Sequence, residues 1–298
     1  INKPIKLNGV GLHNGVNAEL VIKPAPENFG IKFCRVDIDK NDLIPANFNN
    51  VIEPILCTKI ANTNGISVST VEHLMAAFFG EGIDNAIVEV NASEIPILDG
   101  SASDFVEAIR SAGIKEQKTQ RQFIQVEKKV EIKEGEKFIS IEPADNDLII
   151  DFEIIYKNPL IRTRRKEFKL SNGDLTDIYN SRTFCLYEDI EKLRSMGFAK
   201  GGSLDNALVV KGSKLLNKEG LRNKKEFVNH KILDCIGDLY TSGYRIVASV
   251  KCSQGGHYLT NKLLRKLFQN KENFSILEIK EKNLPHTLIN RNLLRSIA

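Results

Sequence analysis

The segment STVEHLMAAFFGEGIDNAIVEV, residues 69–90, predicts a buried helix followed by a buried strand. Its apolar run from about residue 70 to 80 is typical of a core helix, and NAIVEV alternates as a strand does. Glu72 and His73 stand near the start of this helix, where a core helix would ordinarily carry Leu or Ala. Because burial of an unpaired charge is costly, these two side chains need a partner.

Two interpretations of this pair are open. Ser69 and Glu72 have the spacing of a capping box, and a carboxylate near a helix N-terminus also suits the helix dipole. His73 serves no cap, because it lies between Val71 and Leu74 inside the apolar run. The metal motif H-E-x-x-H is absent. A metal at this place would therefore need its other ligands from elsewhere in the chain.

The second half of the chain repeats the order of the first half: a strand meander, a helix, a strand and a helix. A long helix is expected from about 224 to 242, followed by the strand RIVASVKC and the helix HYLTNKLLRKLF. This order predicts an α+β fold of two similar domains, residues 1–120 and 121–272, with helices on one face of each sheet. Residues 273–298 form a tail without a predicted role. A site at the domain interface is expected.

The long helix of the second half contains VNHKILDCIGD, in which His230 and Asp234 are four residues apart and share one face. Such a pair is also found as a surface hydrogen bond, but the apolar residues around it disfavour a solvated face. If the two helices face each other, His73, His230 and Asp234 converge. Two imidazoles and a carboxylate with an open position are typical of catalytic zinc. Glu72 could then take a proton from the attacking water.

The composition is that of an ordinary soluble globular protein, with 298 residues and a formal net charge of +4. This charge permits an anionic small-molecule substrate and is not typical of a dedicated nucleic-acid binder. The five cysteines form no C-x-x-C, which disfavours a disulfide framework and a cysteine zinc site. No apolar run is long enough to span a bilayer, and no signal-peptide pattern opens the printed chain. We therefore expect a cytoplasmic protein without an integral membrane segment.

The sequence resembles the UDP-3-O-acyl-N-acetylglucosamine deacetylases, the zinc amidases of lipid A biosynthesis in Gram-negative bacteria. The resemblance spans nearly the whole chain except its last residues. It rests on seven motifs in the family's order: GVGLHNG (9–15), STVEHL (69–74), EIPILDGSA (94–102), SRTFC (181–185), GGSLDNALVV (201–210), HKILDCIGD (230–238) and GGHYLTNKLL (255–264).

By this resemblance, His73, His230 and Asp234 correspond to the ligands of a Zn²⁺ ion, and Glu72 corresponds to the general base. The ligand set itself leaves zinc and iron open. The implied substrate is UDP-3-O-acyl-N-acetylglucosamine, and the products are acetate and the free amine. No nucleic-acid partner is implied, and we expect a monomer.

The resemblance also implies roles for residues around the metal. His257 corresponds to the histidine that meets the developing charge and protonates the leaving amine, and Asp238 to the acid that orients it. Thr183 corresponds to the hydroxyl that hydrogen-bonds the oxyanion. Phe184 and Lys231 correspond to substrate contacts.

The family fold consists of two β-α-α-β sandwich domains with an insert in each. The second insert would cover about 185–212. Its apolar residues, which resemble an acyl-chain passage, are Met196, Phe198, Leu204, Ala207 and Val209. A small core is the other interpretation of these residues.

Two positions depart from the family pattern. Cys185 stands where Gly often follows the Thr-Phe pair, and Glu142 stands where a basic residue is expected near the diphosphate. Cys57 falls at a pocket position of the family but is interpreted as an inert thiol. His13 is interpreted as a hairpin residue satisfied by the backbone, and His286 receives no role.

Two other functions are alternatives to the hydrolase. A non-catalytic RNA- or nucleotide-binding protein could use the basic run IRTRRKEFK (161–169), which is otherwise a solvated strand or loop or a contact for nucleotide phosphates. The sequence has no RNA-binding signature in which aromatic residues alternate with basic ones, and RNA binding would leave the metal-ligand pattern unexplained. A metal-free Cys-His hydrolase is disfavoured because no feature pairs a cysteine with an activating base.

Overall fold

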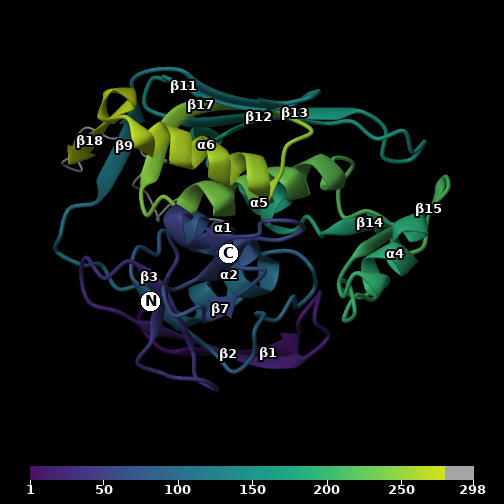
Figure 1. Ribbon diagram of the computed structural model, residues 1–298, viewed down its shortest axis with the longest axis horizontal. Helices are drawn as coiled ribbons and strands as arrows, with labels where there is room; N and C mark the ends of the chain where they lie inside the picture. Colours follow the sequence, from purple (N-terminus) through teal and green to yellow (C-terminus); the bar gives the residue numbers. More distant parts are fainter. Residues whose placement is uncertain (279–298) are drawn as a thin grey trace.

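The computed structural model describes residues 1–278, and its layers are two large sheets with helices between them (Figure 1). The sheet of the second half lies above α5 and α6, while α1 and α2 lie over the sheet of the first half (Figure 1). This layering confirms the predicted α+β fold. The domain boundaries at 120 and 272 stay predictions.

The first sheet has the strand order β1-β2-β8-β3-β4. Its strands are β1 (Ile5–Val10), β2 (Asn17–Pro24), β3 (Ile31–Arg35), β4 (Leu43–Pro45) and β8 (Ala86–Val90). Ala18, Leu20 and Ile22 alternate along β2 and are buried against the helices. Strand β8 runs antiparallel to β2 and parallel to β3, and the crossover that a parallel pair needs includes helix α1.

The second sheet has the order β10-β11-β17-β12-β13, with β9 pairing with β17 and β18 with β9. Its strands are β9 (Gln122–Val126), β10 (Val130–Glu134), β11 (Lys137–Glu142), β12 (Leu148–Ile154), β13 (Arg164–Lys169), β17 (Arg245–Ser253) and β18 (Phe274–Glu278). Strand β17 runs parallel to β12, as β8 does to β3. The repeat predicted from the sequence is thus present, and β18 places the start of the predicted tail at the sheet edge.

The helices between the sheets are α1 (Glu72–Glu81), α2 (Ser103–Ala112), α5 (Glu226–Tyr240) and α6 (His257–Gln269). Shorter helices are α3 (Thr176–Tyr179) and α4 (Ile190–Ser195), and 3-10 turns lie at η1 (Phe48–Asn50), η2 (Leu170–Asn172), η3 (Tyr187–Asp189) and η4 (Lys271–Asn273). Apart from Gly80, every residue of α1 is buried. A helix that is buried all round needs neighbours on all sides, and α1 finds them in the first sheet, α2 and α5.

The N-terminus of α1 shows that the capping-box interpretation is wrong. No side chain caps the helix. Ser69 instead donates to the backbone carbonyl of Ser93, and the Glu72 carboxylate accepts from the backbone amide of Thr58. The chain enters the helix through Thr70, whose φ of 63° is left-handed and directs Ser69 away from the first turn.

Small sheets extend each half. One contains β5 (Val51–Ile52), β6 (Lys59–Ala61) and β7 (Ser67–Val68), and the other contains β14 (Phe184–Leu186), β15 (Leu208–Lys211) and β16 (Lys214–Leu215). Strands β14 and β15 of this small sheet, together with α4, lie in the predicted insert at about 185–212, and β16 follows directly after it. Met196 and Leu204 are 55% and 44% exposed, so the small-core interpretation is wrong for these two residues. Ala207 and Val209 are buried.

Candidate metal centre and active site

His73, His230 and Asp234 form a buried cluster whose ligand atoms all lie within 4.8 Å of one another. His73 comes from the first turn of α1, and the other two residues lie one turn apart on α5. The rings of His73 and His230 are nearly perpendicular, with centroids 4.9 Å apart. Because both residues on α5 are buried, the surface hydrogen-bond interpretation of their spacing is wrong.

The distances within this cluster fit a metal better than a hydrogen bond. The Nε2 atoms of His73 and His230 each lie 3.4 Å from Oδ1 of Asp234. Ligand atoms held at about 2.0–2.1 Å from a tetrahedral ion lie roughly 3.3 Å apart, whereas a good hydrogen bond is shorter. Among the described residues, Oδ1 of Asp234 has no hydrogen-bond partner although it is buried. Such an orphaned acceptor is expected where a cation binds.

The state of His230 also suits a ligand. Burial lowers the pKa of His230 to about 3, even though Asp234 opposes this shift, so the ring is neutral at neutral pH. Its Nδ1 lies 2.9 Å from the carbonyl oxygen of Ser181. A neutral imidazole must donate from Nδ1 to this carbonyl, which leaves the lone pair of Nε2 directed at the cluster.

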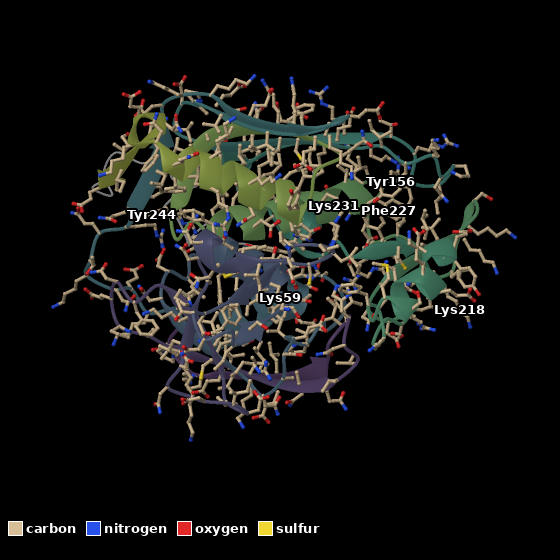
Figure 2. All side chains as sticks on the ribbon, viewed as in Figure 1. Lys59, Tyr156, Lys218, Phe227, Lys231 and Tyr244 are labelled. Carbon is tan, nitrogen blue, oxygen red and sulfur yellow. The ribbon has the colours of Figure 1, made fainter. Side chains whose placement is uncertain are left out.

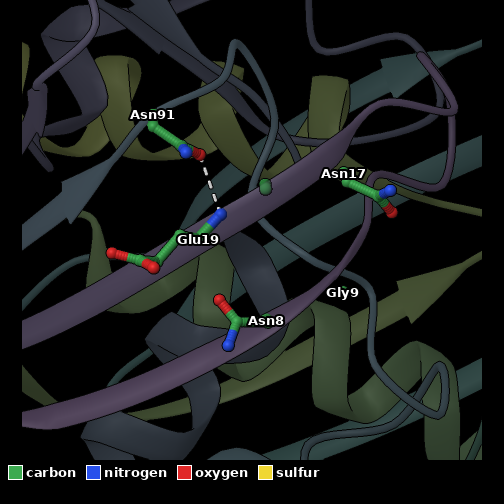
Figure 3. A pocket seen from close by; sticks show the side chains of 6 residues that line it. Asn8, Gly9, Asn17, Glu19 and Asn91 are labelled. Carbon is green, nitrogen blue, oxygen red and sulfur yellow. Dashed lines mark hydrogen bonds between the residues drawn. The ribbon is translucent and has the colours of Figure 1, made fainter.

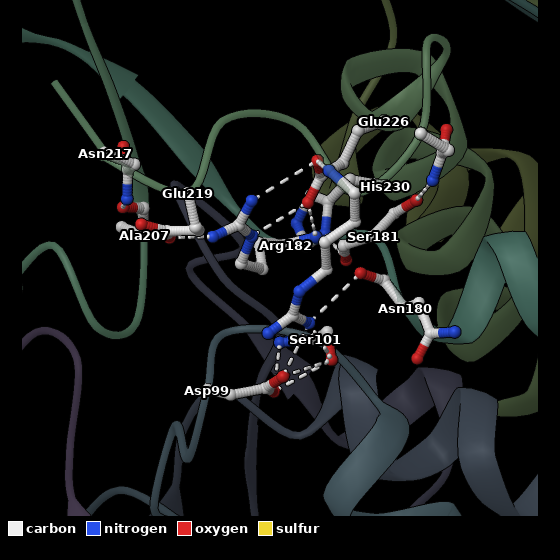
Figure 4. A network of polar contacts seen from close by, with 12 residues as sticks. Asp99, Ser101, Asn180, Ser181, Arg182, Ala207, Asn217, Glu219, Glu226 and His230 are labelled. Atoms are coloured by element: carbon white, nitrogen blue, oxygen red, sulfur yellow. Dashed lines mark hydrogen bonds and ion pairs between the residues drawn. The ribbon is translucent and has the colours of Figure 1, made fainter. Parts of the chain in front are cut away.

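A buried ion pair holds the segment that carries Ser181 (Figure 4). The Arg182 side chain donates from Nε to Oε1 of Glu226 at 2.8 Å, and its backbone amide donates to the same oxygen at 3.2 Å. Arg182 and Glu226 are 2% and 0% exposed. Glu226 lies one turn before His230 on α5. The pair therefore ties the carbonyl that orients the His230 ring to the helix that carries it.

Glu72 and His257 lie beside the cluster, with Oε1 of Glu72 at 3.7 Å from Nε2 of His257. Burial raises the pKa of Glu72, and the charge of His257 offsets part of this effect. The other face of His257 meets Asp238, whose Oδ2 lies 2.8 Å from Nδ1. Burial alone would lower the pKa of His257, but Asp238 and Glu72 raise it to about 9.

Lys231 and Phe184 line the cluster on another side. Lys231 donates to Oδ2 of Asp234 at 2.8 Å, which leaves Oδ1 free for a metal. The Phe184 ring packs against Tyr156 and Phe227 and lies near Lys231. Figure 2 labels Tyr156, Phe227 and Lys231 beside one another. Its centroid lies 6.3 Å from that of His230.

Thr183 lies directly before β14, between the two halves of the chain. Its backbone amide donates to Gly100 and its carbonyl accepts from Leu208.

Comparisons with known proteins show the family to which the chain belongs. The profile of the family described as UDP-3-O-acyl N-acetylglycosamine deacetylase matches residues 1–269. The chain belongs to this family.

Its relatives include proteins named UDP-3-O-acyl-N-acetylglucosamine deacetylase from three bacteria. The protein of Histophilus somni is 44% identical over 95% of this chain and 93% of its own length. That of Pasteurella multocida is 43% identical over 96% and 95%. That of Haemophilus influenzae strain 86-028NP is 42% identical over 95% and 93%.

His13 was expected to be a hairpin residue whose side chain is satisfied by the backbone, and the structure differs from this interpretation. Its backbone amide does bond, to the buried carboxylate of Glu94, but neither ring nitrogen has a hydrogen-bond partner among the described residues. The half-buried ring packs edge to face against Phe198 instead, with centroids 5.3 Å apart. Phe198 of the predicted passage is thereby placed beside the loop 11–15.

The other residues named from the sequence have no proposed catalytic role. Burial raises the pKa of Cys57 to about 12 and also raises that of Cys185, which fits inert thiols. Glu142 pairs with Lys251 on the second sheet. The basic run is largely strand β13, where Arg165 pairs with a neighbouring aspartate. His286 lies outside the described residues.

A shallow hollow on β1 and β2 is lined by Asn8, Gly9, Asn17, Ala18, Glu19 and Asn91 and contains none of the predicted site residues (Figure 3). No helix within residues 1–278 has the length and apolar character needed to cross a membrane. The expected cytoplasmic location and monomeric state stay predictions.

Sequence reasoning missed the residues that support the site. Arg182 lies inside the SRTFC motif, but nothing in its local pattern marks its partner Glu226, which is 44 residues away. Thr58 lies in none of the motifs, although its backbone amide bonds Glu72. No periodicity or spacing would have identified Thr58.

Proposed function

We propose that this chain is a zinc-dependent hydrolase that removes the N-acetyl group from UDP-3-O-acyl-N-acetylglucosamine in lipid A biosynthesis. The products would be acetate and the free amine of the UDP-linked 3-O-acylglucosamine. Family membership and the names of the relatives support this substrate. The observation that carries the proposal is the convergence of the His73, His230 and Asp234 cluster beside Glu72 and His257.

Zinc suits the candidate centre because two imidazoles and one carboxylate with an open position are typical of catalytic zinc sites. His73 and His230 would hold the ion through Nε2 and Asp234 through Oδ1. When bound, the ion supplies a Lewis acid that polarises the amide carbonyl and makes water more acidic. Lys231 donates to Oδ2 of Asp234, so that only Oδ1 of this carboxylate is available to the metal.

Glu72 is the proposed general base. Its Oε2 accepts from the Thr58 amide at 2.9 Å, and its Oε1 faces His257. Oε1 is therefore the oxygen available to take a proton from the attacking water. Burial raises the pKa of this carboxyl group, which makes it a stronger base than an exposed glutamate.

His257 is the proposed general acid. With a pKa raised to about 9, its imidazole is protonated at neutral pH. Asp238 accepts from Nδ1 and holds the ring, so that Nε2 is the atom that can protonate the leaving nitrogen. The same positive charge would stabilise the developing oxyanion, together with the Thr183 hydroxyl.

Substrate binding would use residues at the edge of the centre. Lys231 and Phe184 border the cluster and are the proposed contacts of the sugar nucleotide. The acyl chain would run along the insert. Met196 and half-buried Phe198 offer apolar surface there, and Ala207 is buried in the same insert.

Metal analysis combined with a deacetylation assay tests this function. The purified protein should hold about one tightly bound divalent ion per chain and release acetate from the substrate. His73→Ala and His230→Ala should lose the ion and the activity. His13→Ala, which removes a half-buried histidine outside the cluster, should keep the ion. Full metal stoichiometry in either ligand variant would show that the ligand assignment is wrong.

A further inference from the structure

Thr58 lies buried between the two carboxylates that flank His257. It comes directly before β6 in the small sheet of the first half, and its side chain is 2% exposed. Its carbonyl accepts from the backbone amide of Val71, the residue before α1. The small sheet is thereby attached to the start of the helix that carries Glu72.

Both hydrogen-bond donors of Thr58 are used on these carboxylates. The backbone amide donates to Oε2 of Glu72 at 2.9 Å, and the hydroxyl donates to Oδ1 of Asp238 at 2.5 Å. An ionised carboxylate only accepts hydrogen bonds, so the hydroxyl must be the donor. One residue thus bonds two acids that lie on different helices and 166 positions apart, from 72 to 238.

The remaining oxygen of each carboxylate faces His257. Oε1 of Glu72 lies 3.7 Å from Nε2, and Oδ2 of Asp238 lies 2.8 Å from Nδ1. The four residues form a closed ring of polar contacts in which Thr58 and His257 occupy opposite places. Since Thr58 occupies one oxygen of each acid, it determines which oxygen and which rotation each acid presents to the imidazole.

We propose that Thr58 is a positioning residue for the general acid: its hydroxyl fixes the rotation of Asp238 and thereby the direction of the Nε2–H bond of His257. This inference rests on the proposed function for its kinetic consequence. The physical reason is that proton transfer depends steeply on the placement of the donor relative to the leaving group.

A merely structural role is the competing explanation, because a buried hydroxyl needs a partner wherever it lies. Thr241 offers a matched control. It is also 2% exposed, and its hydroxyl donates to the backbone carbonyl of Asp238 rather than to a carboxylate. Thr241→Val therefore removes a buried hydroxyl near the same residue without freeing an acid.

Kinetics of Thr58→Val and Thr58→Ser form the first arm of the test. Valine keeps the shape and the backbone amide but removes the hydroxyl. We expect kcat to fall by about 10–10²-fold with KM within about twofold and metal content unchanged. Thr58→Ser should restore most of kcat, and Thr241→Val should resemble the parent protein. Equal losses in Thr58→Ser and Thr58→Val, or a normal kcat in Thr58→Val, would overturn the proposal.

A double-mutant cycle with Asp238→Asn forms the second arm. If Thr58 acts through Asp238, adding Thr58→Val to Asp238→Asn should cost little further kcat. If the kcat losses of the two single variants multiplied in the double variant, Thr58 would not act through Asp238. If the valine variant does not fold, Thr58→Ala, which also removes the hydroxyl and keeps the backbone amide, takes its place in the cycle.

Nuclear magnetic resonance of ¹⁵N-histidine-labelled protein forms the third arm and needs no turnover. The Nδ1–H resonance of His257 should shift in Thr58→Val and stay in place in Thr241→Val. An unmoved resonance in Thr58→Val would overturn the positioning role. Absence of deacetylation in the parent protein would instead overturn the proposed function, and the resonance would still report on Thr58.

Discussion

Gly237 of α5 lies against the backbone of Glu72 in α1. A Cβ atom placed on Gly237 would lie 2.0 Å from the carbonyl oxygen of Glu72 and 3.1 Å from the amide nitrogen of Ala76. Backbone cannot yield as a flexible side chain can. Helices α1 and α5, which carry the candidate metal ligands, can therefore approach this closely only because residue 237 has no side chain.

Gly237→Ala should separate α1 from α5 and disturb the metal centre. Overpacking of this kind costs about 1–3 kcal/mol or more in the free energy of unfolding, and we also expect weaker metal binding. Thermal unfolding and metal titration measure the two effects. Leu239→Ala, a cavity-forming change on the same helix, should lower stability but leave metal affinity near that of the parent. Unchanged metal affinity in Gly237→Ala would contradict the argument.

Glu72→Gln should separate chemistry from binding. The amide side chain can still accept from Thr58 but cannot take a proton, so kcat should fall by roughly 10²–10⁴-fold while metal content and KM stay close to the parent. Glu81→Gln is a matched change on the same helix, at a buried glutamate that pairs with Arg110. It should leave kcat nearly unchanged. Near-normal turnover of Glu72→Gln in a steady-state assay would remove Glu72 from the mechanism.

The pH profile of kcat/KM should be bell-shaped, with an alkaline limb that includes loss of the His257 proton. Asp238 and Glu72 raise the pKa of His257 to about 9, so activity should persist through neutral pH and fall above it. Asp238→Asn removes a charge that raises this pKa, and the alkaline limb should move to lower pH. Because neighbouring groups titrate together, the limb gives a macroscopic value.

His257→Gln is the companion measurement for this profile. It should keep the metal, reduce the rate strongly and flatten or displace the alkaline limb. If both limbs of the pH profile of His257→Gln stayed at the parent positions, both proton transfers would be assigned to Glu72.

Glu226→Gln should loosen the segment whose carbonyl orients the His230 ring. It leaves the buried Arg182 guanidinium without its full partner, and breaking such a pair costs about 3–5 kcal/mol of folding stability. Since the Arg182 segment carries the carbonyl that orients His230, metal affinity should fall by about 10–100-fold. Denaturant unfolding and metal competition measure both quantities.

Glu219→Gln is the control for the same guanidinium, because this partner is exposed and solvent screening should leave its contribution to stability small. Equal losses of stability in the Glu219 and Glu226 variants would show that burial of the pair is unimportant.

The repeat, the main elements and the three residues of the cluster could be predicted from local patterns in the sequence. Alternation and helical spacing are local patterns, and ionisable groups on apolar helices stand out because unpaired burial is costly. His230 and Asp234 could be paired from their spacing alone. Their meeting with His73 was an expectation that depended on the two helices facing each other, which follows from the repeat.

The support of these groups depends on contacts between distant segments of the chain, which the sequence does not reveal. Ser69 loses its predicted capping role because Thr70 turns the chain away from the first turn of α1. The Ser181 carbonyl and the Thr58 amide orient His230 and Glu72. Every residue carries such backbone groups, so they leave no mark in the sequence, and they act across long separations along the chain. The close approach of α1 and α5 determines which of these backbone groups lie at the site.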